Sequence, residues 1–118
     1  MTGSKSNNFD QTFLQLDGLL VISGAGELFN HVDQGLPMWT GEGDRSLHIP
    51  VLFQRAFSQA PNVTVGLSGI DAAHDQNLRF AMNATEITTD GFVIEIKTWG
   101  DTHIARASAA WQAIGLAE

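Results

Sequence analysis

Three parts of this sequence carry side chains that suit a polar ligand: Trp99, Arg79 and the loop 41–45, Gly-Glu-Gly-Asp-Arg. Side chains alternate between the faces of a strand, so in the predicted strand that ends at Trp99 the indole shares a face with Glu95 and Lys97. A sugar needs this combination, because its C–H face packs on an aromatic plane and its hydroxyls need charged or amide partners. These residues therefore predict carbohydrate binding. Two other interpretations stay open: Arg79 as a solvated or salt-bridged strand residue, and Trp99 as a contact with a neighbouring subunit.

The other residues that often form catalytic or metal sites do not occur in the sequence patterns typical of such sites. No two histidines have the spacing that places both rings on one metal ion from one element, since they lie in four separate segments, at His31, His48, His74 and His103. The sequence has neither a Gly-x-Ser-x-Gly elbow nor a Gly-rich loop ending in Gly-Lys-Ser/Thr, so hydrolase and phosphate-loop chemistry have no local support. Aspartates gather in predicted turns, where hydrogen bonds to nearby backbone explain them. We therefore expect a protein that is not an enzyme and needs no cofactor or metal.

Composition limits the partners further. The chain has 118 residues, which is enough for one domain with one core, and 43% of them are hydrophobic. The net charge of −7 comes from 13 acidic and 6 basic residues, which argues against duplex nucleic acid and anionic membrane as partners. With no cysteine, neither a disulfide framework nor a thiolate metal site is expected.

The N-terminal residues differ from the rest of the chain. Residues 1–10 are largely polar and show no hydrophobic periodicity, so we expect a flexible arm followed by a single domain over 11–118. No signal peptide is visible, and the apolar run 19–22 is too short to insert into a bilayer. The expected location is therefore the cytoplasm, or the outside of the cell by a non-classical route.

Alternating hydrophobic patterns predict an all-β fold. Glycines make the segment 24–43 appear loop-rich, and an Asp-Gly pair at 17–18 suggests a turn or bulge inside the first strand. No segment has a helical repeat with caps. Six short strands with turns at close intervals favour an antiparallel β-sandwich. The predicted strands cover 13–22, 47–53, 62–70, 77–85, 92–99 and 104–114.

The last predicted strand has one face of small residues around an aromatic side chain. Such a face would let a facing layer approach closely, with Trp111 filling the gap, and could support assembly with other copies of the chain. Its members are Ala105, Ala107, Ala109, Trp111 and Ala113.

A series of short motifs in the second half of the chain has the order and spacing of one known family. They are Phe-Gln-Arg-Ala-Phe at 53–57, Pro-Asn-Val at 61–63, Asp at 71, Asn-Leu-Arg at 77–79, Asp-Gly-Phe at 90–92, Thr-Trp at 98–99 and Ala-Trp-Gln-Ala-Ile at 110–114. With these motifs, about half of the chain resembles the H-type lectin domain, the family of the snail agglutinin and the discoidin C-terminal domain.

The resemblance implies both an assembly and a site. It implies a six-stranded antiparallel β-sandwich that forms a homotrimer, or a hexamer of two trimers, and that binds terminal Gal or GalNAc at shallow sites between protomers in cell adhesion. One protomer would supply Gly43 and Asp44 from the loop, and the next would supply strand residues that include Trp99. Arg79 corresponds to the family's binding arginine.

The chain departs from the family at several positions. Gly100 follows the tryptophan where the snail lectin has a histidine, and Ala105 stands where it has a tyrosine. We include Gly100 and His103 among the site residues, with His103 as the substitute for the missing polar side chains. The family's cysteines are absent. These losses keep a second interpretation open, a structural trimerisation or attachment module that binds no sugar.

Overall fold

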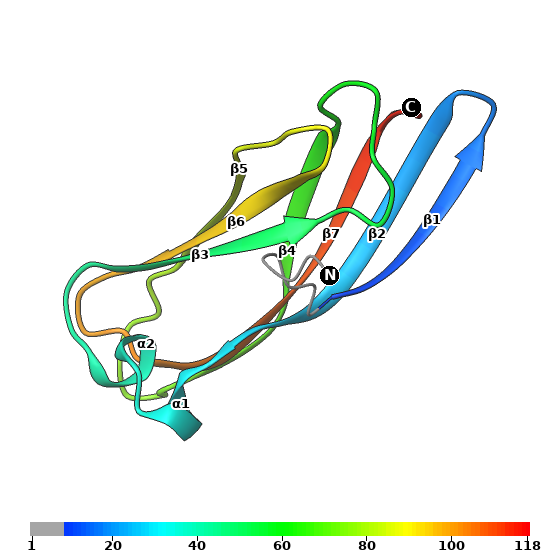
Figure 1. Ribbon diagram of the computed structural model, residues 1–118. Coiled ribbons are helices and arrows are strands. Elements are labelled where there is room, and N and C mark those ends of the chain that lie inside the picture. Colours follow the sequence, from blue (N-terminus) through cyan, green and yellow to red (C-terminus); the bar gives the residue numbers. More distant parts are fainter. Residues whose placement is uncertain (1–8) are drawn as a thin grey trace.

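The computed structural model describes residues 9–118, which form two antiparallel sheets packed face to face (Figure 1). The four-stranded sheet has the order β1 (Asp10–Leu16), β2 (Leu19–Asn30), β7 (Ile104–Leu116) and β4 (Asn62–Ala72). The three-stranded sheet has the order β3 (Arg45–Leu52), β6 (Gly91–Thr98) and β5 (Ala81–Thr85). The predicted antiparallel β-sandwich is confirmed. Residues 1–8 of the expected arm lie outside the described residues.

The first strand of the prediction is two strands in the structure. Leu16 pairs with Leu19, and the residues between them form a tight turn in which Asp17 adopts a left-handed backbone with φ of 54°. Aspartate is one of the few residues that tolerates this conformation, because its short side chain bonds to nearby backbone. The turn suggested at residues 17–18 is therefore present, and the described part of the chain has seven strands rather than six.

Strand β2 extends into the segment that the sequence suggested was loop. It pairs with β7 from Leu19 opposite Leu116 to Asn30 opposite Arg106. Gly24 lies directly opposite Trp111, and a Cβ atom at Gly24 would lie 2.4 Å from Cζ2 of the indole. The glycine here makes room for a neighbouring ring instead of making a turn.

The core is built around the Trp111 indole. Its ring centroid lies 5.2 Å from that of Phe92, 5.8 Å from Phe53 and 6.4 Å from Phe9. Phe9 is only 5% exposed, so the sandwich already includes this residue of the expected arm. The small-residue face of β7 lies on this side, and its alanines are buried beneath the facing sheet. The small residues of β7 therefore let the two sheets of one chain pack closely. This face is buried and is not free for contacts with another copy.

Two short helices close one end of the sandwich, α1 (His31–Gln34) and α2 (Pro37–Thr40) (Figure 1). The buried His31 ring accepts a hydrogen bond at Nδ1 from the backbone N–H of Met38, at 3.1 Å. Burial lowers the pKa of His31, which is consistent with a neutral ring accepting at that nitrogen. Met38 is itself 1% exposed, so the two helices are fixed to the core and to each other. No helix in residues 9–118 is long and apolar enough to cross a membrane.

The close contact between Gly24 and Trp111 leads to a stability prediction. In Gly24→Ala the added methyl group collides with the indole, and overpacking of this kind costs about 1–3 kcal/mol. Urea unfolding at a fixed protein concentration should show that loss. Gly18→Ala is the matched control, because no atom lies within 4 Å of its Cβ position, and its unfolding free energy should change by less than about 0.5 kcal/mol. Equal stability of the two variants would contradict the assigned packing.

Candidate functional site

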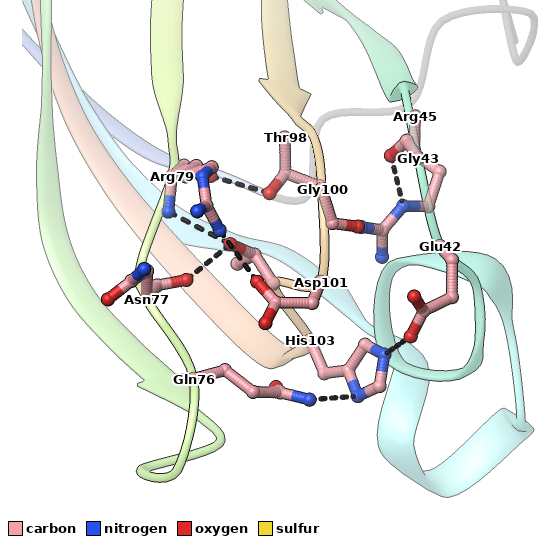
Figure 2. A network of polar contacts seen from close by, with 11 residues as sticks. Glu42, Gly43, Arg45, Gln76, Asn77, Arg79, Thr98, Gly100, Asp101 and His103 are labelled. Carbon is pink, nitrogen blue, oxygen red and sulfur yellow. Dashed lines mark hydrogen bonds and ion pairs between the residues drawn. The ribbon is translucent and has the colours of Figure 1, made fainter.

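The loop 41–45 and the turn 99–103 meet at the end of the sandwich covered by α2 (Figure 2). The backbone N–H of Gly43 donates to the carbonyl of Gly100 at 2.9 Å. Both glycines have positive φ, 76° for Gly43 and 69° for Gly100, a conformation that favours glycine over residues with a Cβ atom. The local sequence thus forms two tight bends, and one hydrogen bond joins them.

The Arg45 side chain connects this loop to the turn 99–103 (Figure 2). Its Nε donates to the carbonyl of Gly43 at 2.9 Å, and its Nη2 donates to the carbonyl of Gly100 at 3.3 Å. Nη1 donates to the carbonyl of Pro37 in α2 at 3.2 Å. The planar guanidinium therefore holds three chain segments together with fixed geometry. The loop residue between Gly43 and Arg45 is Asp44, so its backbone is anchored on both sides.

His103 makes a second tie between the loop and the turn. Its Nε2 lies 3.0 Å from Glu42 Oε2, and its Nδ1 lies 3.2 Å from Gln76 Nε2. With the amide donating to Nδ1, the ring proton is on Nε2 and points at the Glu42 carboxylate. The Trp39 ring also packs edge-to-face with this imidazole, with centroids 6.3 Å apart. His103 is thus engaged by protein groups, and it holds the loop rather than lining a pocket.

Threonine hydroxyls position Arg79. Thr98 Oγ1 donates to the Arg79 carbonyl at 2.5 Å, and the Arg79 N–H donates to Thr102 Oγ1 at 3.0 Å. Thr102 in turn donates to the carbonyl of Asn77 at 2.5 Å. Side-chain partners replace the strand ladder here, which explains why β5 begins at Ala81 and not at residue 77 as predicted.

The guanidinium of Arg79 lies over the turn 99–103 (Figure 2). Its Nη1 is 2.6 Å from Asp101 Oδ1, an ion pair at the protein surface. A Cβ atom at Gly100 would lie 3.2 Å from the same nitrogen. The absence of a side chain at Gly100 therefore lets the guanidinium lie close to the turn, which gives this departure from the family pattern a structural reason.

Three of the expected site residues lie around the end of β6. Arg45 pairs with Thr98, so one residue further along Asp44 faces Trp99. On the other side the ladder ends where Ala81 pairs with Lys97, and Arg79, two residues before Ala81, reaches the turn after Trp99 through its ion pair with Asp101. These residues supply a carboxylate, an indole that is 42% exposed, and a guanidinium. We call them the Asp44–Trp99–Arg79 row.

A shallow pocket of about 320 Å³ lies beside this row. Asp44 and Trp99 line it together in one chain, whereas the family resemblance implies that the loop and the tryptophan of one site come from different protomers. Arg79, Gly100 and His103 do not line it. The full lining consists of Asp44, Arg45, Ser46, Lys97, Thr98 and Trp99.

Several residues of this site had no clear signal in the sequence. Arg45 stood within the loop that the sequence pointed to, yet its bonds reach carbonyls as far as 55 residues away along the chain. Thr98 and Thr102 are buried, and alternation indicated only that Thr98 faces inward. Lys97 was placed on the Trp99 face, but no feature of the sequence marked it as a pocket residue. Among residues 9–118, no group of three or more His, Cys, Asp or Glu side chains could hold a metal ion.

An antiparallel sandwich that has an exposed indole, a carboxylate and a guanidinium at one end has the features of a carbohydrate-binding domain. The sequence profile of the H-type lectin domain matches residues 48–114, more than half of the chain. The protein belongs to the H-type lectin domain family.

Two relatives are similar over most of the chain. It is 47% identical over 95 residues to "ATP synthase subunits region ORF 7" of Fuscovulum blasticum, covering 80% of this chain and 83% of that protein. It is 32% identical over 78 residues to a discoidin-1 polypeptide of Dictyostelium discoideum, covering 65% of this chain and 31% of the discoidin.

A solved structure of discoidin II from Dictyostelium discoideum has the same fold. It superposes with a TM-score of 0.73 at 23% sequence identity, covering 85% of this chain and 38% of the discoidin. The chain therefore spans between 31% and 39% of the length of the discoidins that it matches.

The contacts of Arg45 lead to a prediction about loop order. In Arg45→Met the three donors are lost, and each hydrogen bond contributes about 0.5–1.5 kcal/mol, so the loop should open more readily. We expect the Gly43 amide to exchange with solvent at least about 10-fold faster by NMR. Arg55→Met is the matched control, because that guanidinium lies over the Phe13 ring, 4.7 Å from its centroid, and makes no contact with the loop. An unchanged exchange rate at Gly43 in Arg45→Met would show that the loop is ordered by other means.

Proposed function

We propose that this protein is a lectin that binds terminal Gal or GalNAc at the Asp44–Trp99–Arg79 row. Membership of the H-type lectin family supports carbohydrate binding in general. The observation that carries the finer proposal is the exposed Trp99 indole, which lines a shallow pocket together with the Asp44 carboxylate.

Each side chain of the row would have a separate part in binding. The Trp99 plane packs on the C–H face of the ring, and galactose-type sugars have a broad apolar face because the axial 4-hydroxyl leaves it free. Asp44 accepts hydrogen bonds from two neighbouring hydroxyls, and Arg79 donates to sugar oxygens from a position set by Asp101. These groups only hold and orient the sugar, and no bond is made or broken.

The shape of the site implies modest affinity for a single sugar. The pocket volume of about 320 Å³ is at the lower end of the usual range for ligand pockets, and the indole is only partly enclosed. Several such sites held in one assembly would raise the avidity for a glycan-coated surface by about 10²–10⁴ without new contacts. The proposed function therefore depends on an oligomer.

We propose a homotrimer that forms through the outer face of the four-stranded sheet, with pairing of two trimers giving a hexamer. Cross-strand pairs place an exposed apolar patch at one end of this face, on Leu14, Leu16, Leu19, Ile114 and Leu116. Leu14 and Leu16 are 67% and 68% exposed, which is unusual for leucines at paired strand positions.

The middle of the same face has a flat groove of about 680 Å³. Short side chains line it at Ser23, Ala25, Gly66 and Ala110, so another copy could approach the backbone closely. A face that joins an apolar patch to a groove of small residues has the character of an interface between copies of one chain.

Substitution of the row tests the sugar site. Trp99→Ala, Arg79→Ala and Asp44→Ala should each weaken binding on a glycan array by about 10-fold or more, since an unpaired polar group costs about 1–3 kcal/mol. Arg55→Ala, which removes a guanidinium elsewhere, should bind as the wild type does. We expect binding to persist in EDTA.

Two results of the glycan array would contradict the proposed sugar site. Normal binding by all three variants would place the site elsewhere on the chain. A wild-type oligomer that binds no glycan would favour the alternative of a structural attachment module. Light scattering on every variant checks that the assembly is intact.

Light scattering also tests the interface. The wild-type protein should have three or six times the mass of one chain at micromolar concentration. Leu116→Glu should convert it to monomers with unchanged circular dichroism, because a trimer would bury three carboxylates in an apolar patch. Leu36→Glu, an exposed leucine between α1 and α2, is the control that should leave the mass unchanged. A monomeric wild-type protein would contradict the proposed assembly.

A further inference from the structure

The pocket beside Trp99 extends past the Asp44–Trp99–Arg79 row. Ser46 pairs with Lys97 one step further along the same outward face of β3 and β6, and both residues line the pocket. Two residues of a strand span about 7 Å, so this second pair lies beyond a single pyranose ring stacked on the indole. The pocket therefore has more length than one sugar residue fills.

The second pair has polar groups without strong partners. The Lys97 ammonium is 3.7 Å from Glu95 Oε1, too far for a hydrogen bond, and its side chain is 53% exposed. Among residues 9–118, neither this ammonium nor the Ser46 hydroxyl makes a hydrogen bond. The Arg45 guanidinium beneath them already donates to backbone carbonyls, so Ser46 and Lys97 are the free donors of this part of the pocket.

The charges around Lys97 limit what it can bind. Glu95 lies two residues before it on β6, and Asp44 lines the same pocket. These two carboxylates offset the positive charges of Lys97 and Arg45 and would repel a carboxylate or sulfate on a ligand. Neutral hydroxyls, which accept from an ammonium and exchange hydrogen bonds with a serine, fit this environment better.

We infer that Ser46 and Lys97 form a second subsite, which binds the penultimate sugar of a neutral glycan whose terminal sugar lies on Trp99. This inference rests on the proposed function of the row. It makes the recognised unit a disaccharide and assigns Lys97 a part in specificity that monosaccharide binding does not require.

Titration calorimetry with two kinds of probe tests the subsite. The probes are methyl galactoside and a panel of neutral galactose-terminated disaccharides with different linkages. For the wild-type protein, the best disaccharide should bind about 5–20-fold more tightly than methyl galactoside, from one or two added hydrogen bonds. The readout is this affinity ratio, which changes only if the residue contacts the second sugar.

Substitutions of Lys97 should change the ratio. In Lys97→Met it should fall to about 1–2, while Lys97→Arg, which retains donors, should keep most of it. Arg55→Met removes one positive charge away from the pocket and should leave the ratio at the wild-type value.

Three results would overturn the inference, and they are distinguishable. Disaccharides that bind no better than methyl galactoside would remove the second subsite and leave the proposed terminal site standing. A sulfated or carboxylated disaccharide that binds most tightly, and loses this advantage in Lys97→Met, would show that the subsite takes an acidic sugar. Failure of every probe to bind would overturn the inference together with the proposed function.

Discussion

The packing of the Trp111 indole between the two sheets is the contact on which the rest of the structure depends. The ring lies over Gly24 of the neighbouring strand and reaches Phe53 and Phe92 on the facing side. Buried alanines on β7 let the three-stranded sheet come close enough for these rings to touch. The relative position of β6 and β7 is fixed by this packing. The turn that joins those two strands is also the turn that presents Trp99.

At the end of the sandwich that carries the pocket, backbone N–H and C=O groups outside the sheets form hydrogen bonds with side chains. Arg45 takes up carbonyls from the loop, the turn and α2, and two threonine hydroxyls take up the backbone around Arg79. Glu42 and His103 add a contact between side chains. Irregular backbone can be well ordered when its polar groups have such partners. The row thus stands on a rigid support although none of its three residues lies within a strand.

The outer faces of the two sheets have different character. The outer face of the three-stranded sheet is polar and ends at the exposed indole. The outer face of the four-stranded sheet has the exposed leucines and the groove of small residues. A loop and a tryptophan within one chain line the pocket.

The sequence by itself determined the β class, the turn at residues 17–18 and the outward direction of Trp99, because alternation with one buried face specifies both a strand and its orientation. It also named Asp44, Arg79 and Trp99, through the family resemblance. Only the tertiary structure decided that β2 continues through Gly24, that the alanines of β7 face the core, and that Arg45 and the threonines hold the site. These features depend on distant partners, since β2 pairs with β7 from Leu19 opposite Leu116 and Arg45 bonds to a carbonyl 55 residues away. The local hydrophobic pattern predicts the secondary structure of a segment and its buried face. Which other segments it packs against depends on strand pairing and long-range hydrogen bonds.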